Sequence, residues 1–135
     1  MSAAATIALL RRARELLVTR GHCKGSPMRT ADGAYAPRPA LAASFSVTGA
    51  LMAAAEEQGA PWGVDKGDAD NAIRALHIAI KGDGASRGRA YIEVADANDA
   101  LPEAEAKARA VAWLTESIGI VNSSKRPRAV RRGAA

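Results

Sequence analysis

Four segments of this chain repeat apolar residues every three or four positions, and that spacing limits the fold more than any other feature of the sequence. In the first segment the stripe ends at Gly21 and contains Ile7, Leu10, Ala13 and Leu17. Such spacing places the apolar side chains on one face of an α-helix. The same pattern returns over residues 40–58, where Leu41 and Phe45 are expected on the buried stripe, over residues 68–82, and again from residues 99–102 to 119. The sequence therefore predicts four helices that pack their apolar faces together.

Glycine, proline and short alternating stretches separate the predicted helices. Residues 22–39 contain three prolines and are expected to form a loop, in which Asp32-Gly33 favours a tight turn between strands at 28–30 and 34–36. Residues 91–94, Tyr-Ile-Glu-Val, alternate and predict a short strand, with a turn after it at 96–99. The expected fold class is mostly α (α+β), with about four helices and one or two short strands in a single small domain.

Alanine supplies much of the apolar content, and only five residues are aromatic. Small side chains favour helices that pack at close range. Gly49 lies in the middle of the second predicted helix, where a glycine costs up to about 1 kcal/mol relative to alanine. We therefore expect the backbone of another segment to pack closely against Gly49.

Positive charge is concentrated at the C-terminal end of the chain. Residues 125–132 hold five basic residues and no acid, namely Lys125, Arg126, Arg128, Arg131 and Arg132. Without these five the chain has 14 basic and 14 acidic residues. We expect a helical domain over residues 1–122 and a flexible basic tail over residues 123–135, since the tail shows no apolar periodicity.

The charge of the remaining chain is divided along the sequence. Residues 1–38 contain seven bases and two acids, whereas residues 39–124 contain seven bases and twelve acids. A body polarised in this way suits contact with a protein partner or with another copy of itself.

The single cysteine and the absence of a long apolar run indicate the compartment. One cysteine excludes an intrachain disulfide and suits a reducing environment. No apolar run approaches the roughly 18 residues that a membrane span needs. We expect a cytoplasmic protein that does not interact with membranes.

His22 and Cys23 form the most suggestive chemical pair, because they stand side by side after Gly21. A reactive thiolate needs a lowered pKa and a base held within hydrogen-bond reach, but the C-terminal end of a helix disfavours negative charge. A buried structural thiol is therefore the favoured interpretation, while an enzymatic role stays open.

Three other places fit ordinary structural roles. His77 lies beside the apolar stripe of the third predicted helix, and residues 82–89 lack a phosphate-loop pattern. Asp96, Asn98 and Asp99 lack the further oxygens of a calcium loop. We expect no metal site and no cofactor, and we assign no catalytic residue.

Several short motifs resemble those of a family of small uncharacterised proteins from bacteria, notably actinobacteria, and their phages. That family shows a G-W-C-x-G turn, an A-D-G turn, an F-C-A-x-G-A-L helix and a late W-N-D before a final helix. The matching positions are Gly21, Cys23, Gly25, Phe45, Gly49, Ala50, Leu51, Asn98 and Asp99. Here His22, Ser46 and Ala97 replace the family's tryptophan, second cysteine and second tryptophan, which puts any role that needs those residues in doubt. The resemblance implies a bacterial or phage source and no particular activity.

Three hypotheses about function follow from these features. The first is a non-enzymatic protein-interaction module that binds itself or a protein partner. The second is an accessory, sequence-independent nucleic-acid binder that uses the basic tail, because clustered cations attract phosphate backbones. The third is a ligand-binding or enzymatic site around Cys23, His22 and Asp99.

Overall fold

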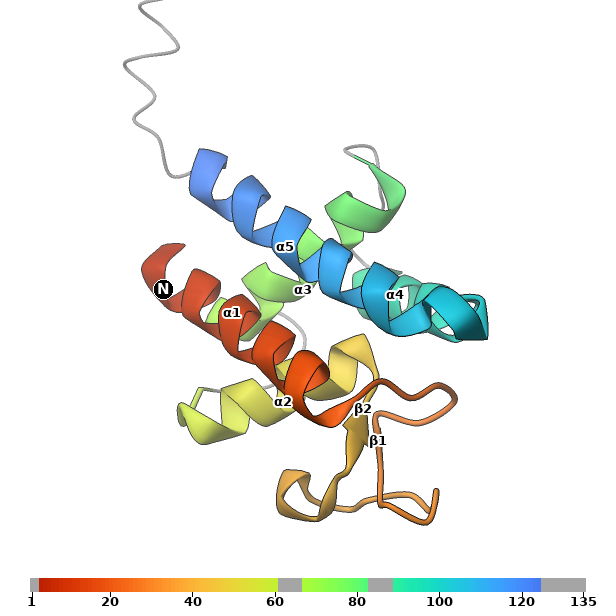
Figure 1. Cartoon of the computed structure of the whole chain (residues 1–135). Helices are drawn as coiled ribbons and strands as arrows, with labels where there is room; N and C mark the ends of the chain where they lie inside the picture. Colours follow the sequence, from red (N-terminus) through yellow and green to blue (C-terminus); the bar gives the residue numbers. More distant parts are fainter. Residues whose placement is uncertain (1–2, 61–66, 83–88, 125–135) are drawn as a thin grey trace, which may run out of the picture.

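The computed structural model describes residues 3–60, 67–82 and 89–124, and this part of the chain forms five α-helices around one core (Figure 1). The helices are α1 (Ala3–Arg20), α2 (Val47–Glu57), α3 (Gly67–Lys81), α4 (Ala90–Asp99) and α5 (Ala106–Ser124). Two strands, β1 (Met28–Arg29) and β2 (Ser44–Phe45), and two short 3₁₀ turns, η1 (Pro39–Leu41) and η3 (Glu103–Glu105), complete the described elements.

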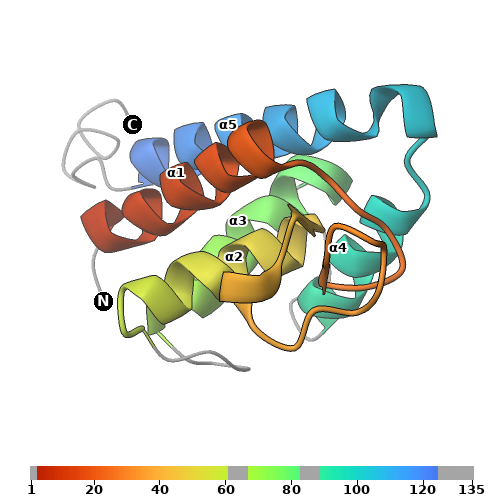
Figure 2. The same cartoon turned by 60° about the horizontal axis from the view of Figure 1, so that its bottom comes forward.

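Helices α1 and α5 lie side by side over α2 and α3 (Figure 2). Helix α1 contacts α5, α2 and α3, and α3 also packs directly against α5. Helices α1 and α5 run antiparallel, since Arg14 donates to Thr115 while Lys107 donates to the carbonyl of Val18. The predicted stripe of α1 is confirmed, because Leu10, Ala13 and Leu17 are buried. Leucines of α1 meet a run of small buried residues on α2, Ala50 and Ala53–Ala55, so these two helices approach closely.

The second helix begins seven residues later than predicted, at Val47. Ser46 stands at the N-cap, and its hydroxyl accepts a hydrogen bond from the backbone nitrogen of Gly49. This bond satisfies one of the free donors at the start of a helix. Residues 40–46 instead form part of η1 and strand β2, so Leu41, which was expected on the buried stripe, is 48% exposed.

The predicted hairpin is present only as a turn. The nitrogen of Thr30 donates to the carbonyl of Ala34, and an isolated bridge joins Arg29 to Tyr35. The paired strand of β1 is β2, which lies further along the chain, with Met28 opposite Phe45 in an antiparallel register. A mostly helical fold with two short strands is therefore confirmed, with a different strand partner.

The predicted strand at residues 91–94 is wrong, because these residues belong to α4. Ala90, Val94 and Asn98 are its buried residues, and they are spaced by four positions, as on one helical face. The predicted turn at 96–99 is the last turn of this helix. The described residues consequently contain five helices where about four were expected.

Close packing of a backbone against Gly49 is confirmed. A Cβ atom added at Gly49 would lie 1.7 Å from the carbonyl oxygen of Pro27. The same oxygen accepts a hydrogen bond of 2.8 Å from the nitrogen of Ser46. The chain before β1 thus crosses directly over the first turn of α2, and only glycine fits between them.

Two features discussed from the sequence fall wholly or mostly outside the described residues. They are most of the 82–89 loop and the basic residues of the tail. Among the helices that the structure describes, none combines the length and the apolar character that a membrane crossing requires.

Candidate functional site

Several residues that carry the family resemblance meet at one end of the molecule, which we call the motif corner. It consists of residues 21–27, the first turn of α2 and the last turn of α4. Backbone bonds join the nitrogen of Phe45 to the carbonyl of Gly21 and the nitrogen of Cys23 to the carbonyl of Phe45. The motif corner therefore gathers segments that lie more than 70 residues apart in the sequence.

Asn98 is the polar centre of the motif corner. Its side chain is fully buried, and its Oδ1 accepts a 3.0 Å hydrogen bond from the nitrogen of Val47. Its Nδ2 donates to the carbonyl of Cys23 at 3.2 Å and to Asp99 at 3.3 Å. The Nε2 of His22 lies 2.7 Å from the same Oδ1. Because that oxygen only accepts, His22 donates through Nε2, and all the bonding groups of the amide are used.

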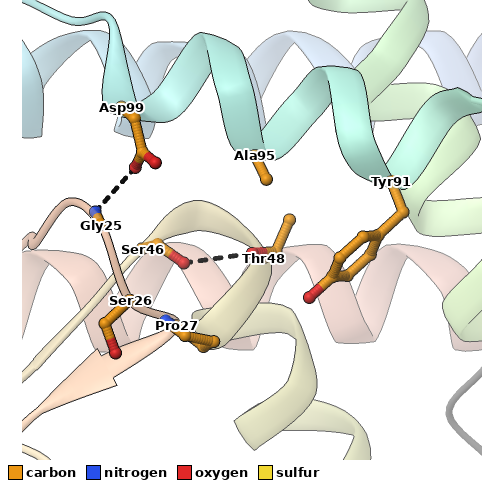
Figure 3. Close-up of a pocket in the computed structure, with 8 residues that line it drawn as sticks. All are labelled: Gly25, Ser26, Pro27, Ser46, Thr48, Tyr91, Ala95 and Asp99. Carbon is orange, nitrogen blue, oxygen red and sulfur yellow. Dashed lines mark hydrogen bonds between the residues drawn. The ribbon is translucent and has the colours of Figure 1, made fainter. Parts of the chain in front are cut away.

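Asp99 secures the loop on the other side of Asn98. Its Oδ1 accepts a 2.8 Å hydrogen bond from the nitrogen of Gly25 (Figure 3). Lys24, between these contacts, donates to the carbonyl of Leu101 at 2.7 Å. The loop that follows α1 is thereby held to the end of α4 through both backbone and side-chain groups.

The thiol of Cys23 is buried and protonated. Its Sγ donates to the carbonyl of Ser26 at 3.4 Å, and burial raises the pKa of the thiol above its ordinary value. Among the described residues no hydrogen bond joins Cys23 to His22, whose bonded nitrogen faces Asn98. The pair predicted to be structural therefore has no nucleophile–base geometry, and the prediction of a buried thiol is confirmed.

The second histidine is satisfied at the edge of the core, as predicted. His77 on α3 is 2% exposed, and its Nε2 lies 2.7 Å from Oε1 of Glu93 on α4. This hydrogen bond lowers the pKa of Glu93. The pair joins α3 to α4. Glu93 was not predicted as the partner of His77, because residues 91–94 alternate in hydropathy as a strand does.

Metal-binding chemistry has no candidate in residues 3–60, 67–82 and 89–124, where no three histidine, cysteine or acidic side chains come together to hold an ion. Of the acidic residues weighed as cation ligands, Asp96 is exposed on α4, whereas Asp99 bonds to the loop. The five basic tail residues lie outside the described part of the chain, so their predicted role stays a prediction.

A second candidate region, the loop face, consists of residues 34–41 and the neighbouring side chains Met52 and Glu56 of α2. Tyr35 is 62% exposed here, and Leu41 is 48% exposed. Two hollows of about 330 and 350 Å³ flank Pro39, and Pro39 and Glu56 line both. Arg20 holds this loop by donating to the carbonyls of Pro39 and Ala42. Apolar spacing does not reveal this surface, because it predicts Leu41 on a buried helical stripe.

Fold and site together define a small helical domain whose N-terminal loop is fastened to α2 and α4 by a buried asparagine. Residues 1–119 match a family described as a family of unknown function, DUF6197. The chain belongs to this family, which agrees with the expectation of an uncharacterised family. Comparisons with the curated proteins and with the solved structures found no match.

Proposed function

We propose that this protein is a non-enzymatic interaction module that associates with a second copy of itself through the loop face. The observation that carries the proposal is the pairing of protruding apolar side chains with apolar hollows on one surface. Contiguous exposed apolar surface of this kind marks interaction sites, whereas isolated exposed side chains are ordinary.

The loop face is complementary to itself in shape. Tyr35 and Leu41 protrude from the loop, while prolines and methionines line the hollow beside it, including Pro37, Met28 and Met52. In a two-fold dimer the same patch is used twice, so a protrusion on one copy fills a hollow on the other. A second copy of the chain therefore supplies both halves of the fit.

The loop face is also complementary to itself in charge. Arg38 and Glu56 are exposed, and neither side chain has a hydrogen bond or ion pair to the described residues. Arg38 precedes Pro39, which lines both hollows together with Glu56. In a two-fold arrangement Arg38 of each copy meets Glu56 of the other, which favours a second copy over an unrelated partner.

The charge difference between the two halves of the sequence supports this proposal less than we expected. Arg12 pairs with Glu57, and Lys24 lies 3.6 Å from Glu103, so the basic N-terminal part is partly neutralised within the molecule. The local pair on the loop face therefore carries the electrostatic argument.

Sedimentation over a concentration series tests the proposal. The average mass of the wild type should rise toward twice the 14.0 kDa of one chain, and Tyr35→Ser should weaken the association. Ile92→Ser removes another exposed apolar side chain, on α4, and should leave association unchanged. A wild type that stays monomeric up to about 1 mM would overturn the proposal.

The second candidate function is accessory nucleic-acid binding by the basic tail, and five positive charges in eight residues support it. The arginines of the first helix add little to such binding, because Arg12 and Arg14 are bonded to Glu57 and Thr115. Deletion of residues 125–135 should remove a weak, salt-dependent affinity for duplex DNA. Equal binding by both forms would contradict this candidate.

The third hypothesis, a ligand-binding or enzymatic site around Cys23, His22 and Asp99, finds its best test in thiol alkylation. Reaction of native Cys23 as fast as that of the unfolded chain would support it.

We further propose a cytoplasmic location, a bacterial or phage source, and the division into a domain over residues 1–122 and a tail over residues 123–135.

A further inference from the structure

A hollow in the motif corner has polar groups at both ends (Figure 3). Its volume is about 170 Å³, and it lies between the loop after α1, the first turn of α2 and the outer side of α4. The lining includes Gly25, Ser46 and Asp99, three positions of the family motifs. Drug-sized ligands occupy roughly 300 Å³ or more, so this hollow selects a much smaller molecule.

The inner end of the hollow provides a hydrogen-bond donor. Ser46 and Thr48 are 5% and 2% exposed, and their hydroxyl oxygens lie 3.1 Å apart. The oxygen of Ser46 also accepts from the nitrogen of Gly49. Only one of the two hydroxyls can donate to the other. The hydrogen of the accepting hydroxyl therefore has no acceptor among the described residues. A buried donor of this kind requires an acceptor oxygen from water or from a ligand.

The outer end of the hollow provides an acceptor with negative charge. Asp99 binds Gly25 and Asn98 through Oδ1, and its Oδ2 has no hydrogen bond to the described residues. Figure 3 shows the carboxylate at the end of α4, with the ring of Tyr91 at the opposite side of the hollow. Carboxylates prefer charged donors such as ammonium groups.

From these opposed groups we propose that the hollow binds a small zwitterion, namely a free amino acid with a short side chain. The carboxylate of the ligand accepts the spare hydroxyl hydrogen of the Ser46–Thr48 pair at the start of α2, where the helix dipole also favours negative charge. Its ammonium group binds Oδ2 of Asp99. Pro27 and Ala95 supply apolar walls between the two ends. This binding does not use Arg38 and Glu56, the charged pair of the loop face, although Pro27 lines a hollow on each surface.

Titration of the ¹⁵N-labelled full chain with glycine and with β-alanine tests the proposal by NMR. At least one of them should give saturable shifts at the backbone amides of Gly25, Thr48, Gly49 and Asp99. Acetate and methylammonium each carry half of the ligand's chemistry and should bind at least ~10-fold more weakly. Acetate binding as tightly as either amino acid would overturn the proposal, as would the absence of saturable shifts up to about 10 mM.

Separate variants test the two ends of the site. Asp99→Asn keeps an oxygen for Gly25 but loses the charge. The double variant Ser46→Gly/Thr48→Val removes both hydroxyls, because either hydroxyl alone still has a hydrogen to donate, and glycine is tolerated at an N-cap. Both variants should weaken binding at least ~10-fold, whereas the control Asp96→Asn, an exposed residue of α4, should bind as wild type does. Unchanged binding by a folded Asp99→Asn or by the folded double variant would contradict the proposal. Arg38→Glu should bind normally even if it is monomeric, which separates this result from that of the dimer test.

Discussion

At the scale of single residues, Asn98 explains why the motif corner is assembled as it is. Its amide contacts the loop after α1, the start of α2 and its own neighbour on α4. A buried amide with every group bonded stabilises one arrangement, whereas removal of one partner leaves several buried polar groups unsatisfied. The hydrogen bonds of Asn98 therefore give it a structural role, which does not depend on any catalytic function.

Replacement of Asn98 by alanine should lower the free energy of unfolding by about 3 kcal/mol, because the Val47 nitrogen and the Cys23 carbonyl lose their partners. Urea unfolding measures the change. The control is Asn122→Ala, an exposed asparagine on α5, which should change stability by less than about 0.5 kcal/mol. A loss below about 1 kcal/mol for Asn98→Ala would show that the hydrogen bonds of Asn98 contribute little to the free energy of unfolding.

The motif corner was only partly predictable from the sequence. Asn98 and Asp99 were named through the family resemblance, and Cys23 was correctly expected to be buried. Their partners, Val47 and Gly25, could not be predicted, because the contacts join segments that lie far apart in the chain. Asn98 had one local signal: with Ala90 and Val94 it forms a four-residue spacing, which indicates a polar group on a buried helical face.

At the scale of elements, the helices differ in how much room their backbones leave. Gly49 on α2 and Gly119 on α5 are both helical glycines. An added Cβ at Gly49 meets the backbone of Pro27, whereas one at Gly119 has no neighbour within 4 Å. The same substitution should therefore have opposite effects at the two positions.

Gly49→Ala should destabilise the fold by about 3 kcal/mol or more, since the segment before β1 must move away from α2. Gly119→Ala should stabilise it by about 0.5–1 kcal/mol through the higher helix propensity of alanine. Thermal unfolding of both variants measures the two changes. Equal effects of the same sign would contradict the close approach of Pro27 to α2.

The ion pair between α1 and α2 should give stability a dependence on pH. A hydrogen bond from Arg12 lowers the pKa of Glu57, so the pair contributes stability above the ordinary pKa of a glutamate and loses it as the pH falls through the lowered value. Because Glu57 is partly exposed, Glu57→Gln should cost only about 0.5 kcal/mol near neutral pH.

Urea unfolding of wild type and Glu57→Gln between about pH 7 and pH 2 measures this effect. The difference between the two proteins should shrink toward the acidic end. Glu116→Gln on α5 serves as the control, since Glu116 is exposed and has no ion pair to the described residues. A difference that stays constant over the whole range would rule out the pair as its source.

The helices were more predictable than the strands. Three- and four-residue apolar spacing located α1, α3 and the middle of α5, because each buries a stripe. The bounds of α5 differ from the prediction, since it begins at Ala106, after the turn η3, where residues 99–102 were expected, and it ends at Ser124. Helix α4 was missed because its Tyr91–Val94 segment alternates in hydropathy, which over four residues also fits a strand. The start of α2 was misplaced because Leu41 and Phe45 extend the helical spacing toward the N-terminus by coincidence. The helix itself begins only after the N-cap residue Ser46.

At the scale of the whole molecule, the two surfaces described above have different properties. The motif corner is polar, and its hollow has a volume of about 170 Å³, whereas the loop face is apolar and has two larger hollows. Opposite charges from the two halves of the sequence pair inside the molecule at Arg12–Glu57. The proposed association through the loop face should therefore depend on its own side chains, among them Arg38 and Glu56, whose side chains have no partner among the described residues.

A charge-exchange experiment tests self-association through the loop face most directly. Arg38→Glu and Glu56→Arg should each weaken the homodimer at least ~10-fold, because each variant places like charges opposite one another. An equimolar mixture of the two variants should restore dimers close to wild-type affinity, since both contacts of the mixed pair become attractive. A mixture that stays as weakly associated as the separate variants, while the wild type dimerises, would contradict the proposed interface.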